Sequence, residues 1–408
     1  MTRLSPADLT ELRDQIIGAL AAEEPVELIA GGSKRELGRP VQAAHILDLA
    51  HLSGIRDYQP SELVLTAGAG TPLGEIEPAL EEAGQMLAFE PPDWRALLGS
   101  GEQDGAGPTL GGVLACNLSG PRRVKAGAAR DHFLGFRAVS GRGEIFKAGG
   151  KVIKNVTGFD LPKLMAGSHG TLAALEEVTV KVLPQPETVA TLLFAKVEPI
   201  AAGHLMGAAL GSPHEVSGAA YLPAGAAMPF ALPGGGTVGL RLEGPAPSVE
   251  FLCDSLTREH GTSGAAEIVT GSEAIAIWRA IGEAAPLAGL AGHAVWRISV
   301  APARGAELGQ AISRALDAVW FLDWGGGLLW LAVPEGTDAG AEAIRTAIRG
   351  PHGRDTGHAT LVKGSPALRG SVAVFEPQPA PLAALSRRVK DAFDPAHILN
   401  PGRMVEGS

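Results

Sequence analysis

The sequence predicts an α+β protein of two or three domains, and three observations lead to this fold class. The chain has 408 residues, which is more than one hydrophobic core usually accommodates. Residues 1–186 join short apolar stretches through turns rich in glycine and hydroxyl side chains. Beyond them these turns largely disappear, and short strands alternate with helices. We therefore expect one domain over 1–186, a smaller α+β domain of antiparallel strands backed by helices over 187–380, and a C-terminal segment over 381–408.

Composition and charge limit the class of protein. Hydrophobic residues make up 45% of the chain, yet no stretch approaches the roughly 20 apolar residues that span a bilayer. Residues 1–15 are too polar for a secretory signal. The net charge of −10 argues against nucleic acid as a general partner. We expect a cytoplasmic protein, and peripheral attachment at the inner face of the cell membrane stays open.

The two cysteines, Cys116 and Cys253, are far apart and form no Cys-x-x-Cys pair. This spacing excludes an iron–sulfur cluster carried by the chain alone, because such clusters need several cysteine ligands. It also disfavours a secreted disulfide scaffold. One-electron carriers of that kind would have to belong to a partner.

The first elements are a helix, a strand and a turn. The helix is expected to begin with Ser5 as its N-cap and Pro6 at the first helical position. A strand over 26–30 leads into the first glycine turn, residues 31–34 with the sequence Gly-Gly-Ser-Lys. Glycine lets backbone N–H groups approach a ligand, so this turn suits a phosphate group; a plain connecting turn is equally compatible.

Two further strands are expected over 45–49 and 62–67, followed by a helix. Thr71 and Pro72 are placed to cap and start this helix, and Pro78 predicts a kink or a later start. The glycines before and inside it are spaced one residue too widely for the dinucleotide fingerprint G-x-G-x-x-G. A nicotinamide-binding Rossmann fold is therefore disfavoured.

The stretch 89–130 has little periodicity, which predicts a long ordered loop that lines a ligand site. A hairpin follows, with strands over 134–140 and 144–148. The second glycine turn, residues 167–171 with the sequence Gly-Ser-His-Gly-Thr, precedes an apolar strand that ends at Val182. Consecutive N–H groups in such a turn can form a cradle for an anion, although most glycine-rich turns only connect elements.

In the second domain the apolar pattern predicts short strands that alternate with helices. The strands are at 188–196, 237–242, 294–300 and 328–333, and the helices are at 248–260, 273–281 and 303–319. A last helix is expected over 381–393. Residues 351–358 carry His352, Asp355 and His358, which could bind a metal but are more typical of an exposed turn before a strand over 358–362. No metal site is assigned.

Six ordered motifs resemble the FAD-binding fold of the vanillyl-alcohol-oxidase type, also called the PCMH type. They lie at 31–34, 68–73, 109–112, 117–123, 158–171 and 394–403. The most specific are Thr-Leu-Gly-Gly at 109–112, Gly-Phe-Asp-Leu-Pro-Lys-Leu at 158–164 and Asn-Pro-Gly-Arg at 400–403. Within this family, residues 117–123 and 158–168 look most like the FAD-binding subunits of bacterial glycolate oxidases, or glycolate dehydrogenases.

This resemblance implies a PCMH-type domain of two α/β subdomains that binds FAD, with the C-terminal segment folded back onto it. The first glycine turn and residues 109–120 would hold the FAD pyrophosphate through backbone amides, and the second glycine turn would support the adenosine half and the flavin. The FAD is expected to be non-covalent, because the first glycine turn lacks the histidine to which some relatives attach it. The candidate cofactor-binding residues are Gly31, Gly32, Ser33, Lys34, Pro108, Thr109, Gly111, Gly112, Asn117, Ser119, Gly120, Arg122, Gly167, Ser168, Gly170, Thr171 and Asn400.

The resemblance also implies an activity and partners. Glycolate, a small 2-hydroxy acid, would be oxidised to glyoxylate, with electrons passed to a quinone pool through a complex with a catalytic flavoprotein subunit and an iron–sulfur subunit. Two alternatives stay open: an FAD-binding subunit for electron transfer or assembly alone, and a stand-alone FAD-dependent oxidase of another alcohol. The chain lacks the Gly-Asp-Gly-Asn-x-His motif of catalytic relatives, which favours the first alternative for the chemistry itself.

No catalytic residue follows from the sequence. His132 and His169 lie nearest the flavin motifs, but neither is assigned as the base. A 2-hydroxy acid needs a cation for its carboxylate, and arginine binds carboxylates through two parallel hydrogen bonds. Arg122, Arg123 and Arg130 lie beside the predicted flavin loop, although contacts to FAD phosphates or surface ion pairs explain them better.

Overall fold

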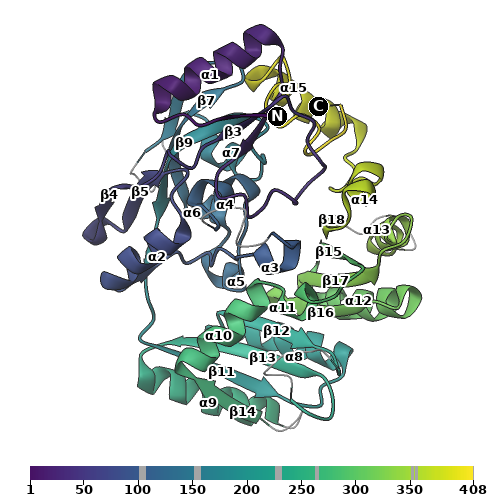
Figure 1. Cartoon of the computed structure of the whole chain (residues 1–408). Coiled ribbons are helices and arrows are strands. Elements are labelled where there is room, and N and C mark those ends of the chain that lie inside the picture. Colours follow the sequence, from purple (N-terminus) through teal and green to yellow (C-terminus); the bar gives the residue numbers. More distant parts are fainter. Residues whose placement is uncertain are drawn as a thin grey trace. The chain divides into compact units, whose positions relative to one another are not determined.

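The computed structural model describes residues 1–100, 107–150, 158–225, 232–261, 266–350, 353 and 357–407. The chain divides into two compact units (Figure 1). Unit 1 contains Met1–Leu118, Ala128–Gln185 and Pro377–Ser408, and unit 2 contains Ser119–Gly127 and Pro186–Glu376. The segment Ser119–Gly127 thus groups with unit 2 and not with the residues on either side of it. No described helix is both long and apolar enough to cross a membrane.

Unit 1 begins with a parallel three-stranded sheet in the order β1-β3-β2. Helix α1 (Leu9–Ala22) buries Leu12 and Ile16 in one core cluster with Val26 of this sheet. Leu399 of the C-terminal segment joins the same cluster and forms a parallel bridge to Val26. The three strands are β1 (Thr2–Leu4), β2 (Val26–Ile29) and β3 (His45–Asp48).

Helix α1 starts later than the sequence predicts. Its N-cap is Asp8 and not Ser5, because the Asp8 carboxylate accepts hydrogen bonds from the N–H groups of Thr10 at 2.8 Å and Glu11 at 2.9 Å. A carboxylate that satisfies two unpaired N–H groups is a strong helix start.

An antiparallel five-stranded sheet, in the order β4-β5-β9-β7-β8, forms the second layer of unit 1. It confirms the predicted hairpin and the strand after the second glycine turn. A short antiparallel pair joins β6 (Gln85–Met86) to β10 (Leu183–Pro184). The five strands are β4 (Ile55–Gln59), β5 (Val64–Gly68), β7 (Phe133–Ser140), β8 (Ile145–Gly149) and β9 (Ala173–Lys181).

The predicted loop over 89–130 is wrong in part, because it contains short helices. The most important is α4, whose N-cap Thr109 accepts a hydrogen bond from the N–H of Gly112 at 3.3 Å. Two glycines lower its intrinsic helix propensity, which hides the helix from a periodicity search. The helices of unit 1 besides α1 are α2 (Leu73–Glu82), α3 (Arg95–Leu98), α4 (Leu110–Cys116), α6 (Ala129–His132), α7 (Leu161–Met165) and α15 (Ala380–Phe393), with a 3₁₀ turn η1 (Pro60–Glu62).

Helix α2 corrects a second expectation. Thr71 does not cap it, because the Thr71 hydroxyl donates to the carbonyl of Gly68 at 2.6 Å. The helix begins at Leu73 and contains Pro78. Thr71 therefore stabilises the turn before the helix instead of the helix itself.

Unit 2 is an antiparallel eight-stranded sheet in the order β14-β11-β13-β12-β16-β17-β15-β18. Strands β12, β14 and β16 were not predicted from the sequence. The strands are β11 (Thr188–Phe194), β12 (Gly218–Leu222), β13 (Thr237–Gly244), β14 (Ala266–Thr270), β15 (His293–Val300), β16 (Val319–Asp323), β17 (Leu328–Pro334) and β18 (Gly357–Lys363).

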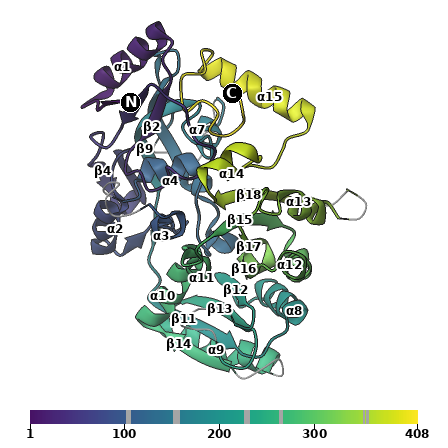
Figure 2. The ribbon, with the colours of Figure 1, turned by 45° about the vertical axis from the view of Figure 1, so that its right-hand side comes forward.

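One face of this sheet forms the main core of unit 2. Helices α8 and α12 lie side by side on it (Figure 2), and α9 and α13 bury residues in the same cluster. The predicted helix over 303–319 is too long: α12 ends at Leu316, and Asp317 adopts a left-handed φ of 49° before β16. The helices are α5 (Arg123–Ala126), α8 (Pro199–Leu210), α9 (Ala246–His260), α10 (Gly271–Gly282), α11 (Ala285–Ala288), α12 (Pro302–Leu316), α13 (Ala341–Arg349) and α14 (Pro366–Ser371), with the 3₁₀ turn η4 (Trp324–Gly326).

Candidate functional site

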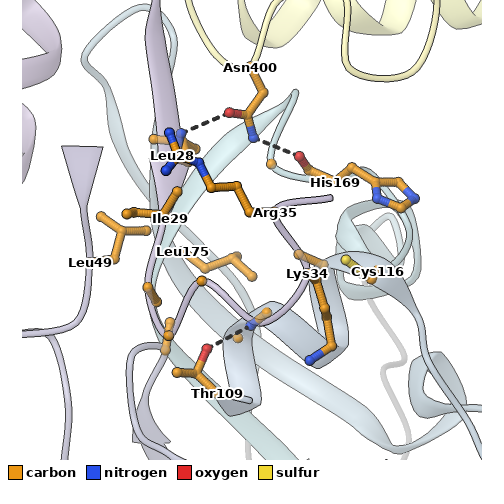
Figure 3. A pocket seen from close by; sticks show the side chains of 18 of the residues that line it. Leu28, Ile29, Lys34, Arg35, Leu49, Thr109, Cys116, His169, Leu175 and Asn400 are labelled. Atoms are coloured by element: carbon orange, nitrogen blue, oxygen red, sulfur yellow. Dashed lines mark hydrogen bonds between the residues drawn. The ribbon is translucent and has the colours of Figure 1, made fainter. Parts of the chain in front are cut away.

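A cavity in unit 1 has about 820 Å³ of empty space, measured out to its open mouth (Figure 3). Its walls come from the end of β2, the first glycine turn, α4, the second glycine turn and the C-terminal segment. Of the candidate residues, those that line it are Gly31, Gly32, Ser33, Lys34, Thr109, Gly111, Gly112, Gly170 and Asn400.

The first glycine turn offers unused hydrogen-bond donors to this cavity. Among the described residues, the backbone N–H groups of residues 31–34 have no hydrogen-bond acceptor in the chain. Gly32 adopts a left-handed φ of 69°, and a Cβ on Gly31 would lie 1.7 Å from the carbonyl oxygen of Gly107. The turn therefore needs glycine at both positions, and its consecutive amides form the kind of nest that holds an anion.

Lys34 adds a cation to this turn. Its ammonium donates to the Ser33 hydroxyl at 3.0 Å, and burial lowers its pKa to about 8. The charges of Cys116 and Asp93 act against this lowering, and that of Arg95 adds to it. A lysine buried in this way is poorly solvated, so an anionic ligand would stabilise its charged form.

Helix α4 packs against the site without offering its first amides. The N–H of Leu110 donates to Thr71 at 3.0 Å, that of Gly111 to Ala69 at 2.9 Å, and that of Val113 to Thr109 at 3.0 Å, each at the backbone carbonyl. A Cβ on Gly111 would lie 2.6 Å from the Ala69 oxygen. The expectation that amides at the start of the 109–120 segment hold a pyrophosphate is wrong for these three, because other carbonyls occupy them.

The second glycine turn is a wall of the cavity but not an anion cradle. The N–H of Gly167 donates to the Leu114 carbonyl at 3.3 Å, that of His169 to the Ala115 carbonyl at 2.9 Å, and that of Thr171 to the Ser168 carbonyl at 3.0 Å. Its amides thus fasten the turn to the end of α4. The N–H of Ser168 donates to the Met165 carbonyl at 3.1 Å. The anion cradle predicted for these residues is not formed, because four of their five N–H groups already have acceptors.

Asn400 connects this wall to β2. Its side-chain oxygen accepts from the Leu28 N–H at 2.8 Å, and its side-chain nitrogen donates to the His169 carbonyl at 2.8 Å (Figure 3). A Cβ on Gly170 would lie 2.7 Å from that nitrogen. Both polar atoms of Asn400 are therefore used inside the protein, and the residue positions the cavity walls.

A buried ion pair holds the C-terminal segment in place. Lys390 donates to the Asp394 carboxylate at 2.7 Å and to the Thr171 carbonyl at 2.7 Å. Asp394 is fully buried and accepts from the N–H groups of Ile398 and Leu399. Burial lowers the Lys390 pKa against the raising effect of Asp394. The pair fixes the chain that delivers Asn400.

Arg403 lines the cavity and was not predicted as a site residue. Its guanidinium donates to the carbonyls of Arg35 at 2.7 Å and Leu37 at 3.1 Å, and to the buried carboxylate of Glu27 at 2.9 Å. These bonds fix the chain directly after the first glycine turn. The sequence feature that could have identified Arg403 is its position in the Asn-Pro-Gly-Arg motif at 400–403.

Two other lining residues carry titratable groups. Burial, and then the charge of Arg403, lowers the pKa of His169 to about 4, so this imidazole is neutral near pH 7. Burial raises the pKa of the Cys116 thiol, with Lys34 and Arg403 acting against it. His132 does not line the cavity; it is fully buried with its ring 5.4 Å from that of Phe89.

The remaining candidate residues lie outside the cavity lining. Asn117 ends α4 in a left-handed conformation, and its side-chain oxygen accepts from the Arg130 N–H at 3.1 Å. Ser119, Gly120 and Arg122 belong to unit 2, where Arg122 pairs with Glu243 at 2.5 Å. The others are Pro108, Gly167, Ser168 and Thr171, next to lining residues in sequence.

Within the part of the chain that the structure describes, no group of three or more His, Cys, Asp or Glu side chains could hold a metal ion. Residues 351, 352 and 354–356, which include the candidate ligands His352 and Asp355, lie outside the described residues. His358 lies on β18.

Comparisons with known proteins agree with this geometry. A model of the FAD binding domain family matches residues 3–149. The Escherichia coli glycolate oxidase subunit GlcE is 34% identical over 401 residues, which cover 96% of each chain. The Bacillus subtilis glycolate oxidase subunit GlcD is 33% identical over 43% of this chain and 35% of its own length.

Solved structures show the same fold. p-Cresol methylhydroxylase superposes with a TM-score of 0.73 at 16% identity and covers 99% of this chain and 88% of its own. The 4-ethylphenol oxidase of Gulosibacter chungangensis gives a TM-score of 0.71 at 15% identity, over 100% of this chain and 89% of its own. The predicted PCMH-type fold is therefore confirmed.

Proposed function

The chain belongs to the family of the glycolate oxidase subunit GlcE, and we propose that it is the FAD-binding subunit of a complex that oxidises glycolate to glyoxylate. It is an FAD-dependent oxidoreductase of the class that acts on CH–OH groups. The observation that carries the proposal is the match to GlcE along 96% of both chains. The cavity supports it, because its amide nest and buried lysine suit an anionic cofactor.

The residues present fit FAD. The pyrophosphate would accept hydrogen bonds from the N–H groups of residues 31–34 and would lie beside the Lys34 ammonium, since charge-assisted bonds of this kind are strong. Gly31 and Gly32 allow the close approach, while Thr109 and Gly170 bound the space. FAD would supply hydride acceptance and stepwise release of single electrons. We propose non-covalent binding.

We also propose two partner chains. The chain's two cysteines cannot ligate an iron–sulfur cluster, so the one-electron carriers would belong to an iron–sulfur subunit. A catalytic flavoprotein subunit would be the second partner, and a quinone pool would take the electrons. We place the assembled complex in the cytoplasm, at the inner face of the cell membrane.

An anaerobic experiment tests the proposal. The full chain is purified, desalted and scanned for flavin, and acid precipitation then tests whether the flavin is released. Glycolate is added without oxygen, first to this chain and then to the chain with its partners. Loss of the flavin absorbance when glycolate is added to this chain alone supports the oxidase function of the chain, and a chain that binds no FAD at all would contradict the proposal.

One observation favours a second candidate function, that of an FAD-binding subunit for electron transfer or assembly. The described cavity lining contains one histidine, His169, and its pKa near 4 makes it a weak base near pH 7. In this case glycolate bleaches the flavin only after the partner chains are added. The same titration therefore distinguishes the two functions.

A further inference from the structure

The second face of the unit 2 sheet, opposite its main core, carries an arginine in a row of aromatic residues. Trp296 and Ile298 of β15 are buried in the core, so Arg297 between them points to the other face. Directly opposite Arg297 are Thr360 on β18 and Trp330 on β17. Arg297 and Thr360 are partly exposed, so a ligand can reach this face.

Two arginines stack on one indole ring here. The Arg123 guanidinium lies 4.5 Å from the centroid of the Trp324 ring, and that of Arg297 lies 4.8 Å from the same centroid. The ring is fixed, because its Nε1–H donates to the Gly120 carbonyl at 3.1 Å. Trp324 itself holds a left-handed φ of 53°, which is rare for a bulky residue and is typical of functional sites.

Arg297 differs from the other partly buried arginines of unit 2. Arg122 pairs with Glu243, and Arg345 pairs with Glu376. Among the described residues, by contrast, Arg297 forms no ion pair and donates no hydrogen bond. A guanidinium has five N–H donors, and leaving them unused away from bulk water is costly.

Charged neighbours of both signs lie near Arg297, and Arg123 has the larger effect on it. Burial, followed by the charge of Arg123, lowers the pKa of Arg297 to about 10, and Asp323 only partly offsets this. Asp323 is buried and accepts from the Trp324 N–H at 2.6 Å. Burial and the two arginines also lower the pKa of His358, so this side chain is neutral near pH 7. Two nearby cations in a poorly hydrated place favour a bound anion.

We propose that Arg297, with Arg123 and Trp324 beside it, binds the carboxylate of a small organic acid on this face of unit 2. The planar guanidinium of Arg297 donates two parallel hydrogen bonds to the two carboxylate oxygens, and the indole holds the guanidinium in place. The identification of the acid as a 2-hydroxy acid such as glycolate rests on the proposed function. The carboxylate site itself does not.

Calorimetric titration of the full chain with bound FAD tests this site, with glycolate and acetate as probes. We expect saturable binding of glycolate that weakens about 10- to 100-fold in Arg297→Met, as for loss of hydrogen bonds to a charged group. Arg297→Lys keeps the charge but not the paired donors, so it should show an intermediate loss. The matched control is Arg314→Met, which removes an exposed arginine from α12 and should bind glycolate as the wild type does.

Bleaching of the flavin by glycolate, measured on the same samples, separates this proposal from the proposed function. If glycolate binds in an Arg297-dependent way but never bleaches the flavin, with or without partners, the carboxylate site stands and the oxidase function fails. If the wild type shows no saturable binding of either acid, or Arg297→Met and Arg297→Lys both bind as tightly as the wild type, the site is overturned.

Discussion

The first and second glycine turns have similar composition, and both reach the same cavity, but their backbone amides do different work. In the first turn, residues 31–34, the N–H groups have no acceptor within the described chain. In the second turn, residues 167–171, four N–H groups are bonded to carbonyls of α4, of the end of α7 and of the turn itself. A glycine-rich turn is therefore an anion site only where its amides are left over after folding.

The largest expected effect comes from Gly31→Ala. The new Cβ would lie 1.7 Å from the Gly107 oxygen, so the backbone of the first turn must move. We expect nearly complete loss of bound FAD and a lower thermal midpoint, measured by flavin absorbance and circular dichroism. Gly74→Ala is the control, since its Cβ meets nothing within 4 Å and should leave both values close to the wild type. FAD retention by Gly31→Ala would contradict the role of the first turn.

Asn400→Ala removes two hydrogen bonds at once, those with the Leu28 N–H and the His169 carbonyl. We expect a loss of about 2–3 kcal/mol in the free energy of unfolding, measured in urea, because each lost bond leaves a partner in a partly buried place. Asn400→Asp keeps the acceptor for Leu28 but places a buried carboxylate oxygen against the His169 carbonyl oxygen, so it should lose at least as much. Equal stability of both variants and the wild type would show that Asn400 does not join the walls.

Lys34→Met tests the cation of the first turn. We expect FAD to bind about 10- to 100-fold more weakly, from the loss of a charge-assisted bond, while the apoprotein is no less stable. The pKa of Lys34 is lowered from its usual value to about 8 in the folded apoprotein. As the pH rises, the folded state therefore releases this proton at a lower pH than the unfolded state does. Its contribution to apoprotein stability should therefore rise with pH above about 8, while its contribution to FAD affinity falls.

The pH dependence of FAD affinity tests whether the contribution of Lys34 to binding falls as the pH rises. Titrations between pH 7 and 10 should show weaker binding at high pH in the wild type and a flatter profile in Lys34→Met. Identical profiles for the two proteins would remove Lys34 from the FAD site.

The smallest effect is expected at Thr171→Val in the second turn. The variant loses the hydrogen bond from the Thr171 hydroxyl to the Ser168 carbonyl, at 2.7 Å, and should lose about 1 kcal/mol of stability. FAD affinity should change by less than about twofold, as for a residue that lies outside the cavity lining and donates nothing to the ligand. A tenfold loss of affinity in fluorescence titration would instead indicate a direct contact.

The sequence reveals both turns but cannot distinguish them. The acceptors of the second turn, Leu114 and Ala115, lie some fifty residues earlier in the chain, and Asn400 lies far beyond it. Helix α4 itself was missed, because glycines at 111 and 112 weaken its local signal and Thr109 was the only marker of its start. Local pattern thus predicts where backbone can approach a ligand, whereas tertiary partners decide which amides remain available.

The same limit applies to the arginines. Arg122 and Arg123 are neighbours in the sequence. No local pattern shows that Arg122 pairs with Glu243 while Arg123 stacks on Trp324. Arg297 lies in a predicted strand and gave no functional signal, because its neighbours across the sheet come from β17 and β18. The family resemblance, by contrast, was recoverable, since six motifs occur in a fixed order along the chain.

Amide hydrogen exchange of the two turns, measured at residue resolution with and without FAD, tests the difference between them most directly. We expect the amides of residues 31–34 to exchange quickly in the apoprotein and to become protected when FAD binds. The amides of Gly167, His169 and Thr171 should be protected already and should change little. Protection gained at the second turn, with none gained at the first, would contradict the assignment of the first turn as the anion site.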